Sequence, residues 1–252
     1  MIDTHCHLDA AEFDADRAAV HAAALAAGVR QIIVPGVAVD HFARQKSTVD
    51  AYAGCVAAYG IHPLYVMDAG SEDVDRLQDW LRRERPLAVG EIGLDFYVEG
   101  LDVARQTAIF VAQLKLAKAF DLPVILHVRR SVDAVLRELR RTRVCGGIAH
   151  AFNGSRQQAD ALIDLGFKLG FGGAATYSGS RRIRELAATL PLESIVLETD
   201  APDIPPAWLN RGRNTPAELP RIATEIAGLR GIPPAVLMTQ ADANAQVVFG
   251  VF

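Results

Sequence analysis

Hydrophobic residues recur along this chain in short runs that are nearly continuous rather than alternating with polar residues. Eight such runs, rich in β-branched and other apolar side chains, span residues 1–4, 31–34, 55–59, 87–90, 124–126, 147–149, 167–170 and 195–197. Continuous apolar runs of this length are typical of strands that are buried on both faces of a parallel sheet. The pattern therefore predicts eight parallel strands.

Amphipathic segments of helical length separate these runs. They span residues 14–27, 71–85, 103–120, 131–143, 155–165, 181–190 and 219–229. Within the third segment, Phe110, Leu114 and Ala117 lie on one stripe, as expected for a helix that packs against a sheet. Eight units in 252 residues leave about 30 residues for each strand and helix, which is the usual length of a βα unit.

This alternation predicts an α/β fold, a TIM-type (β/α)8 barrel, with residues 1–252 forming a single domain. An open, doubly wound sheet is the alternative, but no GxGxxG motif follows the first strand, where the sequence reads HCH. No Ser/Gly-rich linker divides the chain. The longest irregular stretch, residues 202–216, follows the eighth strand, where a barrel enzyme is expected to carry a functional loop.

Composition sets limits on the partners of the protein. The chain is 50% hydrophobic and 22% charged, which suits one large core. Its net charge of −4 creates no overall positive field, so a nucleic-acid substrate would have to be bound by a local patch.

The three cysteines, Cys6, Cys55 and Cys145, form no CxxC pair and lie in apolar, strand-like runs, which predicts buried, reduced thiols. The N-terminus lacks the features of a signal peptide, and no apolar run approaches the roughly 20 residues needed to cross a bilayer. We therefore expect a cytoplasmic protein without a membrane partner. His21 and His41 lie in helical segments and are expected at the surface.

Polar residues follow six of the eight predicted strands: His5 and His7, His62, Glu91, His127, His150, and Asp200. Burying an unpaired imidazole or carboxylate is costly in free energy. One such histidine could be a hydrogen-bonded core residue, but six positions at one rim of a barrel indicate a cation site. His5 and His7 lie two residues apart, so both side chains point to the same face of the strand and can chelate one ion.

Two carboxylates complete the predicted set of ligands. Glu91, in VGEIGLDF, has two oxygens and can bridge two ions, while Gly90 and Gly93 relieve crowding around it. Asp200 ends IVLETD at the rim of the barrel. Glu198 lies one pleat deeper on the same face, where it either supports the site or forms a hydrogen bond inside the barrel.

The ligand types favour particular metals. Four histidines with two carboxylates suit Zn²⁺ or Mn²⁺ better than Mg²⁺ or Ca²⁺, which prefer all-oxygen ligands. The expected cofactor is two divalent metal ions per subunit, with Zn²⁺, Mn²⁺ and Mg²⁺ as the candidates. His62, in GIHPLY, either orients the substrate or protonates a leaving group, or it is a turn residue packed against Pro63.

Several motifs together resemble those of the TatD-type metal-dependent hydrolases, the TatD DNase family of the amidohydrolase superfamily. They are MIDTHCHLD, GIHP, VGEIGLDFY, LPVILHVRR, HAFNGS and VLETDAPD, in that order and at similar spacing over nearly the whole chain. The resemblance implies a TIM barrel in which His5, His7, Glu91 and Asp200 hold one ion. It implies that Glu91, His127 and His150 hold a second. The segment APDIPPAWLNRGRNTP is similar to the proline-rich loop of one bacterial subgroup, and this leaves the substrate open.

The leading hypothesis is hydrolysis by a hydroxide that bridges two metal ions, with Asp200 accepting the proton of the water and Glu91 and His62 as further catalytic residues. The deoxyribonuclease activity of the family implies a phosphodiester substrate, either single-stranded DNA or a small phosphodiester. For such a substrate Arg129, Arg211 and Arg213 are candidate phosphate clamps, unless they pair with surface acids instead.

Two alternatives remain open. The same site could hydrolyse an ester or amide, including the ester of an aminoacyl-tRNA, or the protein could bind metal without turnover. We expect no protein partner and a monomer.

Overall fold

The computed structural model of the protein describes residues 1–250, and in it the strands and helices alternate as the sequence predicts. The strands are β1 (Ile2–Asp3), β2 (Gln31–Pro35), β3 (Cys55–Tyr59), β4 (Ala88–Asp95), β5 (Val124–Arg129), β6 (Gly147–Ala149), β7 (Phe167–Phe171) and β8 (Ile195–Leu197). Each lies parallel to its neighbours in one sheet of order β1 to β8.

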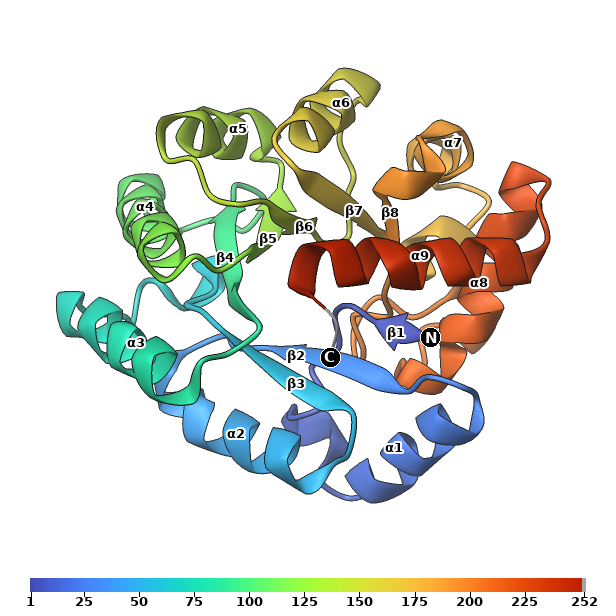
Figure 1. The fold of residues 1–252 in the computed structure, drawn as a ribbon, viewed down its shortest axis with the longest axis horizontal. Coiled ribbons are helices and arrows are strands. Elements are labelled where there is room, and N and C mark those ends of the chain that lie inside the picture. The colour runs from blue at the N-terminus through green and yellow to red at the C-terminus, as the bar shows by residue number, and fades with distance from the viewer. Residues whose placement is uncertain (251–252) are drawn as a thin grey trace.

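The two ends of the sheet meet and nearly close it into a barrel. The Thr4 backbone N–H donates to the Leu197 carbonyl at 3.1 Å, and the Asp200 N–H donates to the His5 carbonyl at 2.8 Å. Helices surround the strands (Figure 1). The predicted TIM-type barrel is confirmed.

The helices are α1 (Arg17–Ala26), α2 (Phe42–Ala51), α3 (Ser71–Glu84), α4 (Val103–Phe120), α5 (Val132–Arg141), α6 (Arg156–Asp164), α7 (Arg181–Thr189), α8 (Leu219–Arg230) and α9 (Pro234–Phe249). Seven of them match the predicted segments within a few residues. The prediction gave no bounds for α2 or α9. α2 is mostly polar, with β-branched Thr48 and Val49 near its end, so its apolar stripe is weak.

Helix α9 closes one end of the barrel. It crosses the front of the barrel in Figure 1, and its Ala245 packs with interior residues such as Ile2, Ala88 and Val196, which lie at or near the first residues of their strands. The barrel is therefore plugged at the amino ends of the strands. The opposite end of the barrel, where the carboxyl ends of the strands lie, is not covered by α9 and can hold a functional site.

Some predictions about single residues need correction. Cys6 and Cys55 are buried free thiols, but Cys145 is exposed because it lies between α5 and β6 rather than in a strand. His41 is exposed as expected. His21 is buried instead, with its Nε2 2.9 Å from the Ala53 carbonyl oxygen.

Within the described chain, no helix combines the length and apolar character needed to span a bilayer.

Candidate metal centre

The polar residues that follow the strands converge at the carboxyl end of the barrel. His5 and His7 follow β1, His62 follows β3, Glu91 and His127 lie in β4 and β5, His150 follows β6 and Asp200 follows β8. Most of them are buried, and the Glu91 side chain at the centre is only 2% exposed. β4 and β5 run further than the predicted segments because these polar residues still belong to the sheet.

One oxygen of Glu91 faces the first group of donor atoms. Glu91 Oε2 lies 3.1 Å from His5 Nε2 and 3.7 Å from His7 Nε2, and the two imidazole nitrogens are 3.3 Å apart. Asp200 Oδ1 lies 3.4 Å from His5 Nε2 and 3.8 Å from His7 Nε2. An ion held about 2.0–2.1 Å from four tetrahedral ligands separates the ligand atoms by about 3.3–3.4 Å. This group therefore fits a divalent ion.

The other oxygen of Glu91 faces a second group. Glu91 Oε1 lies 2.9 Å from His127 Nδ1, 3.4 Å from His150 Nε2 and 3.5 Å from His62 Nε2. The carboxylate thus has nitrogen donors on both sides, as a residue bridging two ions would.

Hydrogen bonds orient two of the imidazoles. His127 Nε2 lies 2.9 Å from Asp95 Oδ2, and a neutral His127 with its proton on Nε2 presents the lone pair of Nδ1 to Glu91. In His62 the order is reversed, because Nδ1 accepts the Leu64 backbone N–H at 3.1 Å. The proton of a neutral His62 is therefore on Nε2, which lies 3.0 Å from His127 Nδ1 and 3.5 Å from Glu91 Oε1.

Asp95 is a further candidate functional residue, which the sequence patterns did not single out. Its carboxylate also accepts the backbone N–H groups of Tyr97 and Val98 at 2.8 and 3.0 Å. Burial raises the pKa of Asp95, but the bonds from His127 and these backbone groups outweigh it and lower the pKa to about 2. The signal was present, since Asp95 lies four residues after Glu91 in the same strand.

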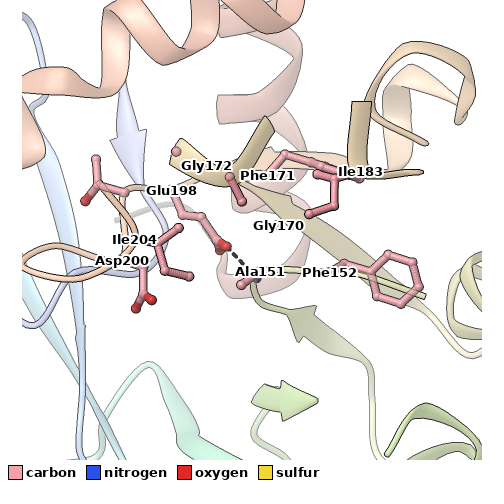
Figure 2. A pocket seen from close by; sticks show the side chains of 12 residues that line it. Ala151, Phe152, Gly170, Phe171, Gly172, Ile183, Glu198, Asp200 and Ile204 are labelled. Atoms are coloured by element: carbon pink, nitrogen blue, oxygen red, sulfur yellow. Dashed lines mark hydrogen bonds between the residues drawn. The ribbon is translucent and has the colours of Figure 1, made fainter. Parts of the chain in front are cut away.

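Glu198 lies beside His150. Its Oε1 is 3.4 Å from His150 Nδ1 and accepts the Ala151 backbone N–H at 2.5 Å, so the predicted hydrogen bond inside the barrel is present and the alternative role of supporting the site stays a prediction. Figure 2 shows this carboxylate directed at Ala151, with Gly170 beside it. A Cβ on Gly170 would lie 2.1 Å from Glu198 Oε2, so glycine there makes room for the acid.

Two further buried side chains, Asp3 and Asn214, hold the segment that carries Asp200. Asp3 accepts the Thr199 hydroxyl at 2.6 Å and the Thr199 N–H at 2.9 Å. Asn214 Nδ2 donates to the carbonyls of Thr199 and Asp203 at 2.8 and 3.0 Å. Neither residue stands out in the sequence, because Asp3 bonds a residue 196 positions away and Asn214 bonds backbone carbonyls of an irregular loop.

Burial and mutual attraction shift the pKa values in this centre. Burial lowers the pKa of His5 well below its usual value and raises the pKa of Asp200 to about 6. Burial also raises the pKa of Glu91, but the attraction of the surrounding histidines outweighs it and holds this pKa well below the usual value. Glu91 is therefore ionised, as a ligand must be.

An open cleft of ≈ 1590 Å³ lies over the centre. Of the three predicted phosphate clamps, Arg129 lines this cleft and Arg211 and Arg213 do not. Arg213 instead pairs with Asp16, at 2.6 Å between Nη2 and Oδ2, which was the alternative for these arginines.

Comparison with known proteins adds a family context. A family model described as TatD related DNase matches residues 2–250. The chain is 39% identical to YjjV of Escherichia coli K12, named an uncharacterized metal-dependent hydrolase, with 100% of this chain and 98% of the relative covered. It is 33% identical to a Klebsiella pneumoniae protein named 3'-5' ssDNA/RNA exonuclease TatD, with 100% and 98% covered.

Solved structures agree with these matches. The crystal structure of E. coli YjjV, described as a TatD homolog, superimposes with a TM-score of 0.95 at 38% identity, covering 100% of this chain and 98% of that one. A TatD family hydrolase from Entamoeba histolytica gives a TM-score of 0.89 at 19% identity, covering 99% and 97%, and shows the same fold.

Proposed function

This chain belongs to the TatD family of metal-dependent hydrolases, and from that premise we propose that it cleaves phosphodiester bonds in single-stranded DNA or in a small phosphodiester. The observation that carries the proposal is Glu91, whose two oxygens each face a separate group of possible ligand atoms, 3.1 Å from His5 Nε2 and 2.9 Å from His127 Nδ1. The nuclease name of the Klebsiella relative supports the choice of a phosphodiester over a carboxylic ester or amide.

The chain supplies two sets of ligands for two divalent ions, with Zn²⁺, Mn²⁺ or Mg²⁺ as the candidates. His5, His7 and Asp200 would hold one ion together with Glu91 Oε2, while His127 Nδ1 and His150 Nε2 would hold the other with Glu91 Oε1. When bound, such ions polarise the phosphoryl oxygens and acidify a water molecule.

Two residues of the chain have separate roles in this proposal, Asp200 as a proton acceptor and His62 as a hydrogen-bond donor. Asp200 Oδ1 faces the imidazoles of His5 and His7, and Oδ2 is the atom that we assign to accept the proton of the attacking water. His62 Nε2–H faces the same centre and would donate a hydrogen bond to the leaving-group oxygen, since its Nδ1 already accepts the Leu64 N–H.

Arg129 binds the substrate phosphate. It lies in β5 two residues after His127, lines the cleft, and has a guanidinium group suited to two hydrogen bonds with a phosphate.

Metal analysis followed by a substrate panel tests this function. The purified protein is reloaded with Zn²⁺, Mn²⁺ or Mg²⁺ and assayed on a single-stranded oligonucleotide, bis(p-nitrophenyl) phosphate and p-nitrophenyl acetate. We expect metal-dependent release of nucleotides that chelation abolishes. His127→Ala should also abolish this turnover, while Asp102→Asn, at the start of α4, should retain it. Turnover of the carboxylic ester alone, with all three metals, would contradict the proposal.

A further inference from the structure

One side of the cleft carries two cations stacked on a single aromatic ring. The guanidinium carbons of Arg129 and Arg130 lie 3.8 and 4.6 Å from the ring centre of Tyr97. All three residues line the cleft, and Tyr97 is 47% exposed. Tyr97 follows β4, Arg129 is the last residue of β5 and Arg130 follows it, and β5 is the next strand in the barrel after β4 (Figure 1).

Both guanidinium groups are available to a ligand. Among residues 1–250, neither Arg129 nor Arg130 forms an ion pair with a carboxylate, whereas Arg44, which also lines the cleft, is bound to Asp14 at 2.7 Å. Stacking on an aromatic ring uses the face of a guanidinium and leaves its N–H edge free. Tyr97 therefore holds two planar cations without consuming their hydrogen-bond donors.

The backbone of Arg130 is unusual. Its φ of 56° lies in the left-handed region, which is unfavourable for residues other than glycine. The next residue, Ser131, is buried and donates its hydroxyl to the Leu94 carbonyl at 2.6 Å, which ties this loop to β4. Backbone strain of this kind, at a residue other than glycine in a firmly held loop, is often found at ligand-binding positions.

Charges of both signs line the cleft. Asp9 and Glu12 follow β1, and Arg44 follows β2. On the β5 side, Asp133 in the first turn of α5 accepts a hydrogen bond from Gln158 at 2.8 Å. Because Arg129 and Arg130 pair with no carboxylate among residues 1–250, an extended polyanion on the β4–β5 side would meet two free guanidinium groups.

We propose that Arg129, Arg130 and Tyr97 form a subsite for two successive phosphates of a single-stranded nucleic acid. Arg129, within β5, binds the phosphate being cleaved, and Arg130, beyond the strand end, binds the next one. Tyr97 is a positioning residue that orients both cations. The inference rests on the proposed phosphodiesterase function and specifies its substrate class as an oligonucleotide rather than an isolated phosphodiester.

The subsite is tested by comparing substrates with several phosphates and with one. In Arg130→Gly and Tyr97→Ala, kcat/KM for a single-stranded oligonucleotide should fall about tenfold more than kcat/KM for bis(p-nitrophenyl) phosphate. Tyr97→Phe keeps the ring and should show the same ratio of kcat/KM for the oligonucleotide to kcat/KM for bis(p-nitrophenyl) phosphate as the parent protein. Arg221→Ala is the matched control, since Arg221 stacks on Trp208 at 4.1 Å outside the cleft, and it should retain that ratio.

Salt dependence and thermal unfolding separate a lost phosphate contact from general damage. Binding of a fluorescent oligonucleotide, measured by anisotropy in EDTA, should lose about 0.7 from the slope of log K against log salt in Arg130→Gly. The Tm of Arg130→Gly should not fall, because glycine adopts a φ of 56° without strain.

Equal losses on both substrates, or an unchanged salt slope, would overturn the subsite. If the parent protein cleaves no phosphodiester but the salt slope still falls in Arg130→Gly, the proposed function fails and the subsite stands. If the parent cleaves phosphodiesters and the slope is unchanged, the function stands and the subsite fails.

Discussion

At the scale of single residues, two imidazoles in the centre, those of His127 and His62, are oriented by the partner of their second nitrogen. The sequence could identify the histidines because polar residues at the ends of apolar strands are conspicuous. It could not identify which nitrogen is free, because the partners come from other strands or from backbone. Asp95 reaches His127 across the β4–β5 pair, and Leu64 N–H reaches His62 within a turn. These contacts support the proposed roles of His127 as a metal ligand and of His62 as a hydrogen-bond donor.

The role of Asp95 can be measured by metal affinity. In Asp95→Asn the negative partner of His127 Nε2 is lost, so the affinity for the second ion should fall about 10–100-fold. Competition with a chelating dye measures both binding steps. Asp102→Asn is the control, because asparagine also caps a helix and Asp102 lies at the start of α4. Equal affinities in Asp95→Asn and the parent protein would exclude the assigned role.

Two substitutions at His62 separate a hydrogen-bond donor from a ligand. His62→Asn keeps an acceptor near the Nδ1 position but removes the Nε2 donor, whereas His62→Gln places an amide near Nε2. We expect kcat to fall about 10²–10³-fold in His62→Asn, with partial recovery in His62→Gln. Both variants should keep the metal content of the parent protein. Loss of one ion per chain, measured by elemental analysis, would instead make His62 a ligand.

At the scale of elements, strands were easier to predict than the loops between them. Hydrophobic runs located all eight strands, but β4 and β5 were predicted too short because their last residues are polar and functional. The loop after β8 carries no periodic pattern at all. Its shape depends on Asn214, a fully buried amide that binds backbone carbonyls of residues up to 15 positions earlier.

Removing the Asn214 amide should disturb this loop as a unit. Asn214→Ala leaves the buried carbonyls of Thr199 and Asp203 without their donor, which should lower the free energy of unfolding by about 1–3 kcal/mol in urea. Because Asp200 lies between them, affinity for the first ion should fall as well. Asn210→Gly is the control, because it changes an asparagine of the same loop whose φ of 46° suits glycine. It should preserve both the free energy of unfolding and the affinity for the first ion. A stability loss with unchanged metal affinity would show that the loop does not position Asp200.

At the scale of the whole molecule, the metal centre joins parts of the chain that are distant in sequence. Its side chains come from β1 and β8, at the two ends of the sheet, and from β4, β5 and β6 between them. The fold class and the converging residues follow from sequence because a barrel places all carboxyl strand ends at one rim. The positions of the Arg211 and Arg213 side chains could not be predicted from sequence. Loop conformation decides whether a surface arginine lines the cleft or, like Arg213, pairs with an acid.

A centre of this kind should make the stability of the barrel depend on metal and pH together. Ions that bind only the folded chain at about 1,000 times their Kd add about 4 kcal/mol, which corresponds to a rise in Tm on the order of 10 °C. Burial lowers the pKa of His150, but the attraction of Glu91 and Asp200 outweighs it and raises the pKa to about 10. An ion must therefore displace a proton from His150 at neutral pH, and this competition weakens as pH rises. The gain in Tm from Zn²⁺ or Mn²⁺, measured by calorimetry against EDTA, should increase from pH 6 to pH 8. Ca²⁺, which prefers oxygen ligands, should give a smaller gain, and a metal effect independent of pH would contradict histidine ligation.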